Sequence, residues 1–475
     1  MIAMTINEIM TAISGISGAD SGIDPYATMA GDVVHDSRVV KAGDLFFAIA
    51  GETYDGHDFV ADALAAGALA AVVERPMPGA TIQVENTVAA LGRLANAVLR
   101  RAPKLTVIAI TGSSGKTTTK DMLANVLSAV GPTVSPPGSH NNELGLPMTV
   151  LSINPHTQWL ILEMGARGKG HIKALCAIAP PDIGVVLNVG SAHLGEFGTV
   201  DDIAAAKAEL IDALPPEGRA ILNIDDPHVA AMASRTDARV IYYGSGQAAS
   251  VRLKSVSLDE FARPRVVLQI GGQTAALSLK VHGEHMAHNA AAVAAAALTS
   301  GVNMRVISLG LSSATIHSPW RMEVTTTADG SIVINDAYNA NPESTAAALR
   351  ALAVIGSGRR TWAVLGEMRE LGDSAEAAHQ QIGRLAARLG VTRLVGVGTG
   401  AEPIVVGAAS VGGFGAVPAF VADIDSAREL LRAEFAAGDV AVIKASRVIG
   451  LERLAADLIA DRGGPSGPDD PWSSA

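Results

Sequence analysis

A glycine-rich loop at residues 111–121, TGSSGKTTTKD, contains the residue types that bind nucleotide phosphates. It is shorter than the usual G-x-x-x-x-G-K-[ST] pattern, because the leading glycine is missing and only two residues separate Gly112 from Gly115. The loop follows a predicted strand and opens a predicted helix, so its backbone N–H groups would face the phosphates. Lys116 would reach the β- and γ-phosphates, and the Thr117 hydroxyl would lie on Mg²⁺. An ordinary Gly/Ser turn is the alternative, and the strand–loop–helix context favours a phosphate loop.

Two further polar residues come where predicted strands end. Glu163 ends the strand of ILEMGA, where a carboxylate is costly unless it has a partner. His193 follows another strand, in NVGSAHLGEFG. Either residue alone would more often be structural. Because parallel sheets place ligands outside the carboxyl ends of their strands, the two residues and Thr117 together predict a magnesium site.

The later segments SPWRME and INDAYNANPES contain another group of polar residues. Arg321 offers a bidentate fork for a phosphate or an acyl phosphate. Turn chemistry and a helix start explain Asn341 and Pro342. They do not explain Asp336, which follows an apolar strand and precedes a tyrosine and two asparagines.

The elements that must position these residues form two alternating series of strands and helices. The first begins near Leu105 and the second near Ser318, and each predicts a parallel sheet with helices on its faces. A smaller mixed α/β unit precedes them. We therefore predict an α/β protein of three domains and a tail. The boundaries are 1–102 for the N-terminal domain, 103–317 for the central P-loop domain, 318–462 for a Rossmann-like domain and 463–475 for a disordered tail.

Composition limits the class of protein. The chain has 475 residues, a net charge of −11 and one cysteine, Cys176. An acidic chain is not expected to bind nucleic acid. No apolar stretch approaches the roughly 20 residues that span a bilayer, and no signal peptide is recognisable. We expect a cytoplasmic protein that acts as a monomer on small molecules.

These segments together resemble the Mur ligases, the ATP-dependent amide-forming enzymes of peptidoglycan precursor synthesis. The shortened loop TGSSGKTTTKD is similar to theirs. The segments NNELGLP, LEMGA, NVGSAHLGEFG, GEHMAHN, INDAYNANP and VLGEMRELG then follow in the order of the family. The resemblance covers about Val33 to Arg447. The DAYNANP form is similar to the member that adds D-alanyl-D-alanine to UDP-N-acetylmuramoyl tripeptide.

The resemblance implies roles for particular residues. It places the uridine diphosphate end of the substrate at Asp36 to Arg38, with Ser37 and Arg38 as contacts. It makes Asn141 and Asn142 substrate-loop residues and Asn289 an adenine-side residue. The implied nucleotide site, for ATP, consists of Gly112, Ser113, Ser114, Gly115, Lys116, Thr117, Thr118, Asn289, Arg321 and Asp336. Lys116, Glu163, His193 and Arg321 are the implied catalytic residues, and Thr117, Glu163 and His193 the implied magnesium ligands.

Lys207 has two interpretations. Its segment, VDDIAAAKAELIDAL, predicts a helix that begins near Asp201, with Asp201 or Asp202 as its cap. A solvated lysine that pairs with a helix neighbour is the simpler interpretation. Sister ligases carry a carbamoylated lysine in the corresponding segment, which implies that Lys207 could serve a magnesium ion. Desolvation would favour the neutral amine that reacts with carbon dioxide.

Two positions depart from the family pattern. The family's KGSR is KASR here, at Lys444 to Arg447, and Trp320 stands where a glycine is common before the arginine. The first departure bears on how closely the backbone approaches at that position, and the second bears on the hinge geometry. The resemblance implies that ATP converts a peptide carboxylate to an acyl phosphate, which the amine of D-alanyl-D-alanine attacks.

The sequence is also compatible with other functions. A sister ligase or a folylpolyglutamate-type ligase is a close alternative, although the chain lacks the DNPR segment of the diamino-acid-adding relatives. A P-loop switch ATPase is an alternative of a different class, and it would hydrolyse ATP without the muramyl substrate.

Overall fold

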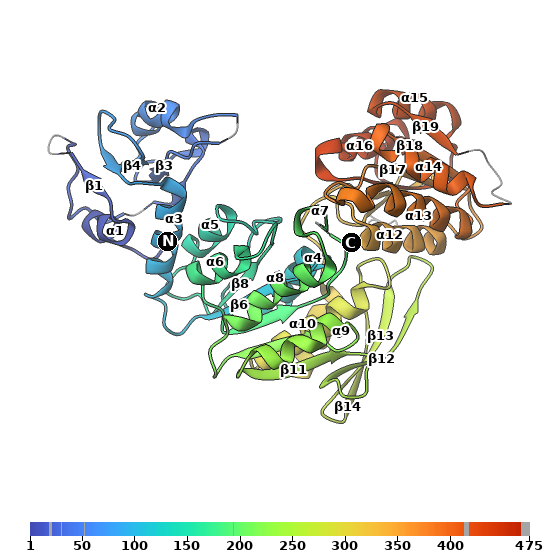
Figure 1. Ribbon diagram of the computed structural model, residues 1–475, viewed down its shortest axis with the longest axis horizontal. Coiled ribbons are helices and arrows are strands. Elements are labelled where there is room, and N and C mark those ends of the chain that lie inside the picture. The colour runs from blue at the N-terminus through green and yellow to red at the C-terminus, as the bar shows by residue number, and fades with distance from the viewer. Residues whose placement is uncertain (19–20, 30, 52, 193, 413–417, 467–475) are drawn as a thin grey trace.

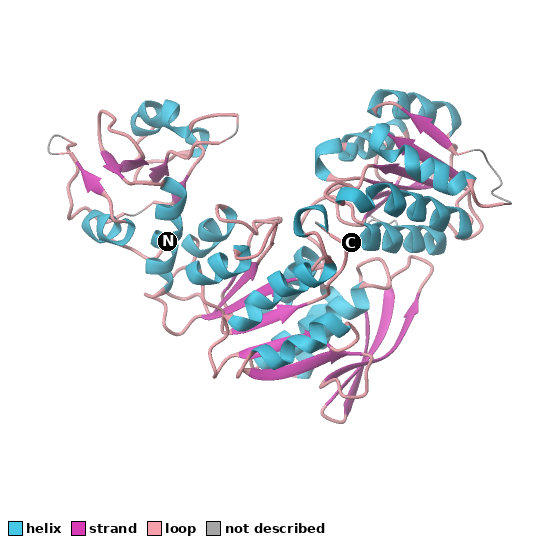
Figure 2. Cartoon of the chain, in the orientation of Figure 1, coloured by secondary structure: helices cyan, strands magenta, loops and turns pink. Residues whose placement is uncertain are grey.

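The computed structural model describes residues 1–18, 21–29, 31–51, 53–192, 194–412 and 418–466. The chain forms three units, each built on its own sheet, and they follow one another from blue to red in Figure 1. Figure 2 shows helices beside the strands of all three units. The predicted α/β class with three units is thus confirmed. None of the helices in the described part of the chain combines the length and the apolar character needed to cross a bilayer.

The first unit contains a five-stranded sheet in the order β1-β5-β4-β3-β2. Its strands are β1 (Ile16–Ser17), β2 (Val33–Val34), β3 (Leu45–Phe47), β4 (Ala70–Val73) and β5 (Thr81–Gln83). Its helices are α1 (Ile6–Ile13), α2 (Val60–Ala65) and α3 (Thr87–Leu99), with short 3₁₀ helices η1 (Ser37–Val39) and η2 (Gly56–Phe59). In β3, Leu45 and Phe47 pack on one face and Phe46 on the other, as the period-two alternation of a strand requires.

The central unit contains a nine-stranded sheet in the order β14-β13-β12-β11-β10-β9-β6-β8-β7. Its strands are β6 (Thr106–Thr111), β7 (Thr133–Val134), β8 (Trp159–Glu163), β9 (Ile183–Val186), β10 (Arg219–Asn223), β11 (Arg239–Gly244), β12 (Val251–Leu258), β13 (Pro264–Ile270) and β14 (Gln273–Ser278). Strand β6 pairs in parallel with β8 and β9. In that register Ile110 lies opposite Glu163, and Thr111 lies opposite Val186. The three strands therefore end together, beside the glycine loop.

Helices cover both faces of the central sheet. They are α4 (Lys116–Ser128), α5 (Gly145–Leu151), α6 (His171–Ile178), α7 (Leu194–Phe197), α8 (Val200–Asp212), α9 (Pro227–Ala231), α10 (Met286–Thr299) and α11 (Met304–Ser313), with η3 (Met232–Arg235). Along β6, Val107 and Ala109 enter one core cluster, while Ile108 and Ile110 enter the other. The first cluster also contains the buried residues of α1 and α3, so the first unit shares its core with the central unit.

One end of the central sheet differs from the expectation of a parallel sheet. Strands β12, β13 and β14 pair in antiparallel fashion, and no strands were predicted in this segment. Exposed and buried residues alternate irregularly along β12, because its register with β13 shifts between Leu253 and Ser255. Antiparallel strands tolerate a solvated face, whereas the buried parallel strands read as continuous apolar runs.

The third unit contains a six-stranded sheet in the order β15-β16-β20-β17-β18-β19. Its strands are β15 (Glu323–Thr326), β16 (Ile332–Asn335), β17 (Thr361–Gly366), β18 (Arg393–Val397), β19 (Ala419–Val421) and β20 (Val440–Lys444). Its helices are α12 (Pro342–Ile355), α13 (Ala375–Arg388), α14 (Glu402–Ala409), α15 (Ile424–Glu434) and α16 (Leu451–Asp461), with η4 (Gly372–Ser374), η5 (Thr399–Ala401) and η6 (Arg447–Ile449). All its strand pairs are parallel except β15 with β16.

The first residues of the predicted tail are ordered rather than disordered. Ala328 N donates to Gly464 O at 3.0 Å, and Ser466 N donates to Thr326 O at 2.8 Å. These bonds extend the edge strand β15, which otherwise offers unpaired backbone groups. The rest of the predicted tail, 467–475, lies outside the described residues.

Candidate active site

The glycine loop runs between the end of β6 and the start of α4. Gly115 is the N-cap of α4 and has a φ of +79°, which favours glycine. A Cβ at Gly115 would lie 2.8 Å from Oδ1 of Asn289, so the loop also needs glycine for space. Lys116 Nζ donates to the carbonyl oxygen of Gly112 at 2.7 Å. The amide groups at the start of α4 can therefore meet an anion, with the lysine folded back over the loop.

Glu163 is a buried carboxylate, 1% exposed, at the end of β8. Its Oε2 accepts a hydrogen bond from the Thr117 hydroxyl at 2.7 Å. Its Oε1 accepts hydrogen bonds from the Ser139 hydroxyl at 2.7 Å and from Nδ2 of Asn141 at 2.8 Å. These bonds fix both oxygens of the carboxylate beside the first turn of α4.

Burial and charge act against each other in this cluster. Burial lowers the pKa of Lys116, Glu163 opposes that shift, and Arg321 adds to it. Burial alone would raise the pKa of Glu163, but Lys116, Arg321 and the bonds from Ser139 and Asn141 together lower it. Glu163 is therefore held as a carboxylate, whereas the charged form of Lys116 is only partly compensated by Glu163 and is suited to meet an anion.

The loop after β9 lies against the glycine loop. Ser114 N donates to Oδ1 of Asn188 at 2.9 Å, and Gly190 N donates to the Ser113 hydroxyl at 2.8 Å. The predicted magnesium ligand His193 belongs to this loop but lies outside the described residues.

The described part of the predicted magnesium site fits a hard cation. No cluster of three His, Cys, Asp or Glu side chains occurs among the described residues. A hydroxyl oxygen of Thr117 and a carboxylate oxygen of Glu163 nevertheless lie 2.7 Å apart. Such oxygen donors match the preference of Mg²⁺, which usually keeps several of its waters.

The third unit contributes positive charge to the same place. Arg321 lies with its guanidinium carbon 4.1 Å from the ring centroid of Tyr338. Its Nε is buried and has no hydrogen-bond partner within the described residues. Asp336 accepts a hydrogen bond from Nζ of Lys444 at 2.6 Å and from the backbone N–H of Met322 at 3.0 Å. Asp336 thus fixes the segment that contains Arg321.

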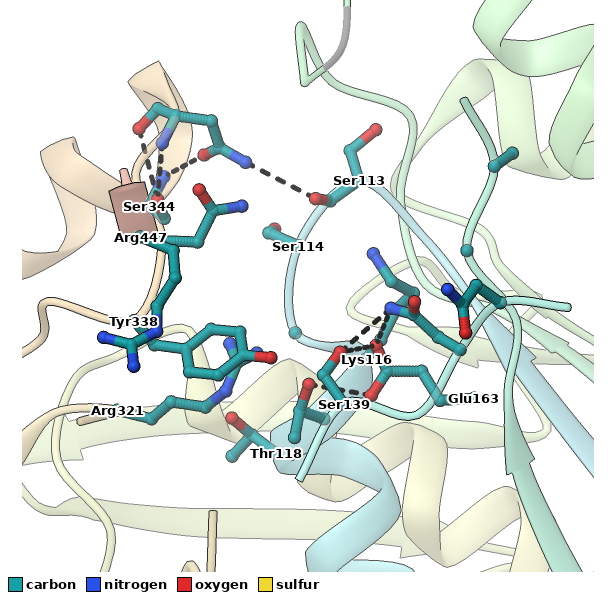
Figure 3. Close-up of a pocket in the computed structure, with 18 of the residues that line it drawn as sticks. Ser113, Ser114, Lys116, Thr118, Ser139, Glu163, Arg321, Tyr338, Ser344 and Arg447 are labelled. Carbon is teal, nitrogen blue, oxygen red and sulfur yellow. Dashed lines mark hydrogen bonds between the residues drawn. The ribbon is translucent and has the colours of Figure 1, made fainter. Parts of the chain in front are cut away.

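All three units line one cavity of about 1330 Å³. Lining side chains include His35 from the first unit, Lys116, Thr117, Thr118, Ser139, Asn141, Asn142 and Glu163 from the central unit, and Arg321, Asp336, Tyr338, Lys444 and Arg447 from the third. In Figure 3, Lys116, Ser139 and Glu163 lie opposite Arg321, Tyr338 and Arg447. The structure therefore brings together predicted residues that are more than two hundred positions apart in the sequence.

Two predicted substrate residues lie elsewhere. Ser37 is half-buried in η1, and Arg38 is exposed and paired with Asp36 at 2.7 Å. Among the described residues that line the cavity, the first unit contributes His35 rather than Ser37 or Arg38. His35 lies near enough to the cavity residue His140 to contribute, after burial, to the lowering of its pKa.

The two predicted asparagines of the substrate loop differ in what they bind. Asn141 belongs to the Glu163 cluster. Asn142 accepts a hydrogen bond from Gly145 N at 2.9 Å and thereby supports the start of α5. Asn289 lies behind the glycine loop, 6% exposed, and is not among the lining residues that the structure describes.

Lys207 is buried in α8, with 3% exposure. Burial, with a smaller contribution from Lys116, lowers the pKa of Lys207 to about 7. The predicted helix is present, but its cap was predicted wrongly. Thr199 is the N-cap and accepts a hydrogen bond from Asp202 N at 3.1 Å, because the helix begins one residue earlier than its acidic residues suggested.

Sequence reasoning missed several residues of the cavity. Ser139 precedes the two asparagines and could have been noticed as a polar neighbour. Tyr338 belongs to the DAYNANP segment, but the sequence does not reveal its contact with Arg321. His285 lines the cavity from the GEHMAHN segment, and burial lowers its pKa to about 4.

The chain matches known protein families along most of its length. Residues 32–102 match the catalytic domain of the Mur ligase family. Residues 110–297 match the Mur ligase middle domain, and residues 320–447 match the Mur ligase glutamate ligase domain.

Individual relatives resemble the whole chain. A UDP-N-acetylmuramoyl-tripeptide–D-alanyl-D-alanine ligase of Mycobacterium bovis is 46% identical over 502 residues, which cover 97% of this chain and 98% of that relative. The crystal structure of MurF from Acinetobacter baumannii is similar with a TM-score of 0.87 and 32% identity, over 96% of this chain and 99% of that one. The MurF ligase of Thermotoga maritima, solved in complex with ADP, is similar with a TM-score of 0.80 and 30% identity, over 91% and 98% of the two chains.

Proposed function

The chain belongs to the Mur ligase family, and we propose that it is the member that joins D-alanyl-D-alanine to UDP-N-acetylmuramoyl tripeptide. It is an ATP-dependent ligase that forms an amide bond and releases ADP, in the synthesis of peptidoglycan precursors. The observation that carries the assignment is the 46% identity with a ligase of this specificity over 97% of the chain. The cavity lined by all three units gives that reaction a place in the molecule.

ATP binds at the glycine loop. The amide groups at the start of α4 and the side chain of Lys116 meet its phosphates, and the relative solved with ADP supports this use of nucleotide. From the third unit, Arg321 adds a guanidinium whose Nε has no partner among the described residues. Asn341 Nδ2 donates to the carbonyl oxygen of Ser113 at 3.4 Å, which joins the third unit to the loop.

The reaction has two steps. A carboxylate oxygen of the tripeptide attacks the γ-phosphorus of ATP, the bond from that phosphorus to the bridging oxygen breaks, and ADP leaves with the electron pair. The neutral amine of D-alanyl-D-alanine then attacks the acyl carbon. Phosphate leaves with the electron pair of the C–O bond, and the nitrogen loses a proton.

The residues of the cavity make the first step accessible. A carboxylate repels a triphosphate by about 4 kcal/mol for each pair of unit charges at 4 Å and an effective dielectric constant of 20. Lys116 and Arg321 offset that repulsion where the charge develops. The acyl phosphate must be kept from water. Contacts such as that from the Ser191 hydroxyl to Glu343 Oε1, at 2.9 Å, hold the third unit over the loop after β9.

Magnesium is the proposed metal. Thr117 and Glu163 would hold it, with His193 as a third ligand from the loop after β9. When bound, it would neutralise charge on the transferring phosphoryl group. The chain's own part is to keep Glu163 ionised, which Lys116, Arg321 and the bonds from Ser139 and Asn141 do.

Lys207 is proposed as a carbamoylated lysine that serves the same metal region. Its burial in α8 and its lowered pKa, about 7, favour the neutral amine that combines with carbon dioxide. Incubation with ¹³C-bicarbonate should give a carbamate carbon signal by NMR that is absent from Lys207→Ala. Absence of this signal from the unmodified chain, together with full activity of the variant, would show that Lys207 only packs the helix.

We propose a separate role for each of the three domains. The first domain, 1–102, binds the uridine diphosphate end of the substrate through Ser37 and Arg38. The central domain, 103–317, binds ATP, and the third, 318–462, supplies Arg321 and Asp336 to it. The protein acts as a monomer in the cytoplasm, where its small-molecule substrates are.

A phosphate-release assay tests the function. Release should require ATP, the UDP-muramyl tripeptide and D-alanyl-D-alanine together, because each unit of the cavity serves a different part of one reaction. Each substrate is omitted in turn, and Lys116→Ala serves as the inactive control. Equal release with ATP alone would exclude the ligase and favour a switch ATPase.

A further inference from the structure

The linker between the central and third units is tied down at both ends. At its start, Ser318 N donates to Oδ2 of Asp121, a residue of the helix that follows the glycine loop, at 3.1 Å. At its end, Met322 N donates to Oδ1 of Asp336 at 3.0 Å. The side chains between these anchors therefore have defined positions relative to both walls of the cavity.

Trp320 occupies this linker in an unusual backbone conformation. Its φ is +59°, in the left-handed region that favours glycine, and Met322 shares that region with a φ of +49°. A large ring at such a position costs conformational energy. The cost is offset only if the ring makes contacts that a glycine cannot make.

The ring of Trp320 contacts Arg447. The guanidinium carbon of Arg447 lies 4.1 Å from the ring centroid, the geometry of a cation–π contact. On its other side, Arg447 pairs with Glu452, with 2.6 Å between its Nη1 and Oε1 of Glu452. Arg447 lines the cavity, so these two contacts fix a cation at the wall of the third unit.

Arg321 and Arg447 each stack on an aromatic ring, but they act on different parts of the cavity. Arg321, the next residue of the linker, stacks on Tyr338 and acts on the glycine loop, where it affects the pKa of both Lys116 and Glu163. Arg447 stacks instead on Trp320 and lines the same cavity. With Lys116 and Arg321 assigned to the phosphates of ATP, Arg447 is left for another anion.

We propose that Trp320 is a positioning residue that holds the guanidinium of Arg447 as the binding group for the carboxylate of the incoming amine substrate. The proposal rests on the ligase function above. D-alanyl-D-alanine reacts through its amine and keeps a carboxylate that needs a cation in a confined site. A guanidinium binds such a carboxylate with two parallel hydrogen bonds, which requires a fixed plane, and the indole supplies that plane.

Steady-state kinetics of three variants test the ring. Trp320→Gly removes the ring and relieves the backbone, and it should raise KM for D-alanyl-D-alanine about tenfold, with KM for ATP and for the tripeptide unchanged. Trp320→Phe keeps a ring and should stay within about twofold of the unmodified enzyme. Arg447→Gln should raise the same KM at least about tenfold. If Trp320→Gly equals or improves on the unmodified enzyme, the position is only a hinge and the proposal is wrong.

The carboxylate itself is tested with a changed substrate. D-alanyl-D-alanine amide lacks the charge, so the unmodified enzyme and Arg447→Gln should use it with nearly the same KM. If Arg447→Gln raised KM for the amide as much as it raises KM for D-alanyl-D-alanine, Arg447 would bind something other than this carboxylate. A rise in KM for ATP or for the tripeptide would lead to the same conclusion.

The matched control is Arg263→Gln. Arg263 also stacks on an aromatic ring, Phe261, at 4.3 Å, and pairs with a carboxylate, Asp259, at 3.0 Å, but it does not line the cavity. The Arg263→Gln variant should leave KM for ATP, for the tripeptide and for D-alanyl-D-alanine unchanged. Thermal melting checks that every variant is folded. If Trp320→Gly does not fold, Arg447→Gln still tests the proposal, because the side chain of Arg447 is exposed. Ligation by the unmodified enzyme is measured first, because its absence would refute the function rather than this proposal.

Discussion

The central and third units hold their charges at the two walls of the cavity in different ways. On the central wall, Glu163 is fixed by short hydrogen bonds from Thr117, Ser139 and Asn141. On the third wall, two arginines lie on the faces of aromatic rings, with guanidinium carbons 4.1 Å from the ring centroids.

This difference separates chemistry from binding. Hydrogen bonds of 2.7–2.8 Å fix the Glu163 oxygens in both distance and direction, as a site that stabilises a transition state requires. A ring face fixes the plane of a guanidinium and leaves its edges free for a ligand. Changes to Glu163 and its partners should therefore lower kcat, whereas changes to Trp320 and Arg447 should weaken binding. Arg321, which also offsets charge in the first step, should affect both.

Lys116→Ala should have the largest effect. It removes the cation of the glycine loop, so kcat/KM should fall about a thousandfold. Stability should be unchanged or higher, because burial lowers the pKa of Lys116 and the folded state thus disfavours its charged form. Single-turnover kinetics and thermal melting measure the two effects. Near-normal turnover by a folded variant would place the phosphate site elsewhere.

Asp336→Asn should have an intermediate effect of a different kind. It leaves the buried ammonium of Lys444, 2% exposed, without its carboxylate, which costs about 3 kcal/mol of stability. The linker that carries Arg321 also loses a charged acceptor, so KM for ATP should rise about tenfold. Urea unfolding and ATP kinetics check both results. A large fall in kcat without loss of stability would mean that the third wall takes part in the chemistry as directly as the central one.

Ser37→Ala should have the smallest effect. One hydroxyl contact contributes about 1 kcal/mol, so the dissociation constant for the UDP-tripeptide should rise about fivefold. Affinity for ATP should not change, since Ser37 lies in η1, outside the cavity that the glycine loop lines. Calorimetry with each ligand separates the two. Weaker ATP binding with normal tripeptide binding would overturn the role of the first unit.

Apart from Ser139, the residues that fix Glu163 on the central wall could be predicted from the sequence, because they belong to local motifs. Thr117 lies at the start of a helix, and Glu163 lies at the end of a strand. The parallel register of β6 with β8 brings the two residues together. The buried parallel strands could also be predicted, because they appear in the sequence as continuous apolar runs.

The third wall was only partly predictable. Arg321 and Asp336 were identified, but the sequence does not reveal that Arg321 stacks on Tyr338, or that Asp336 pairs with Lys444, which is far away along the chain. Trp320 was noticed as a departure from a family pattern, yet only the structure gives it a positive φ and a partner. The strands β12–β14 were missed: the alternation of β12 is broken by its register shift between Leu253 and Ser255, and most residues of β14 are exposed.

Oxygen isotope transfer tests the ligase assignment most directly. The tripeptide is labelled with ¹⁸O in its reacting carboxylate and incubated in ordinary water with the enzyme, ATP and D-alanyl-D-alanine, and the products are analysed by mass spectrometry. If the carboxylate is activated as an acyl phosphate, one labelled oxygen should appear in the released phosphate and the other should remain in the new amide. Released phosphate without label, or ADP formed without any ligated product, would contradict the assignment.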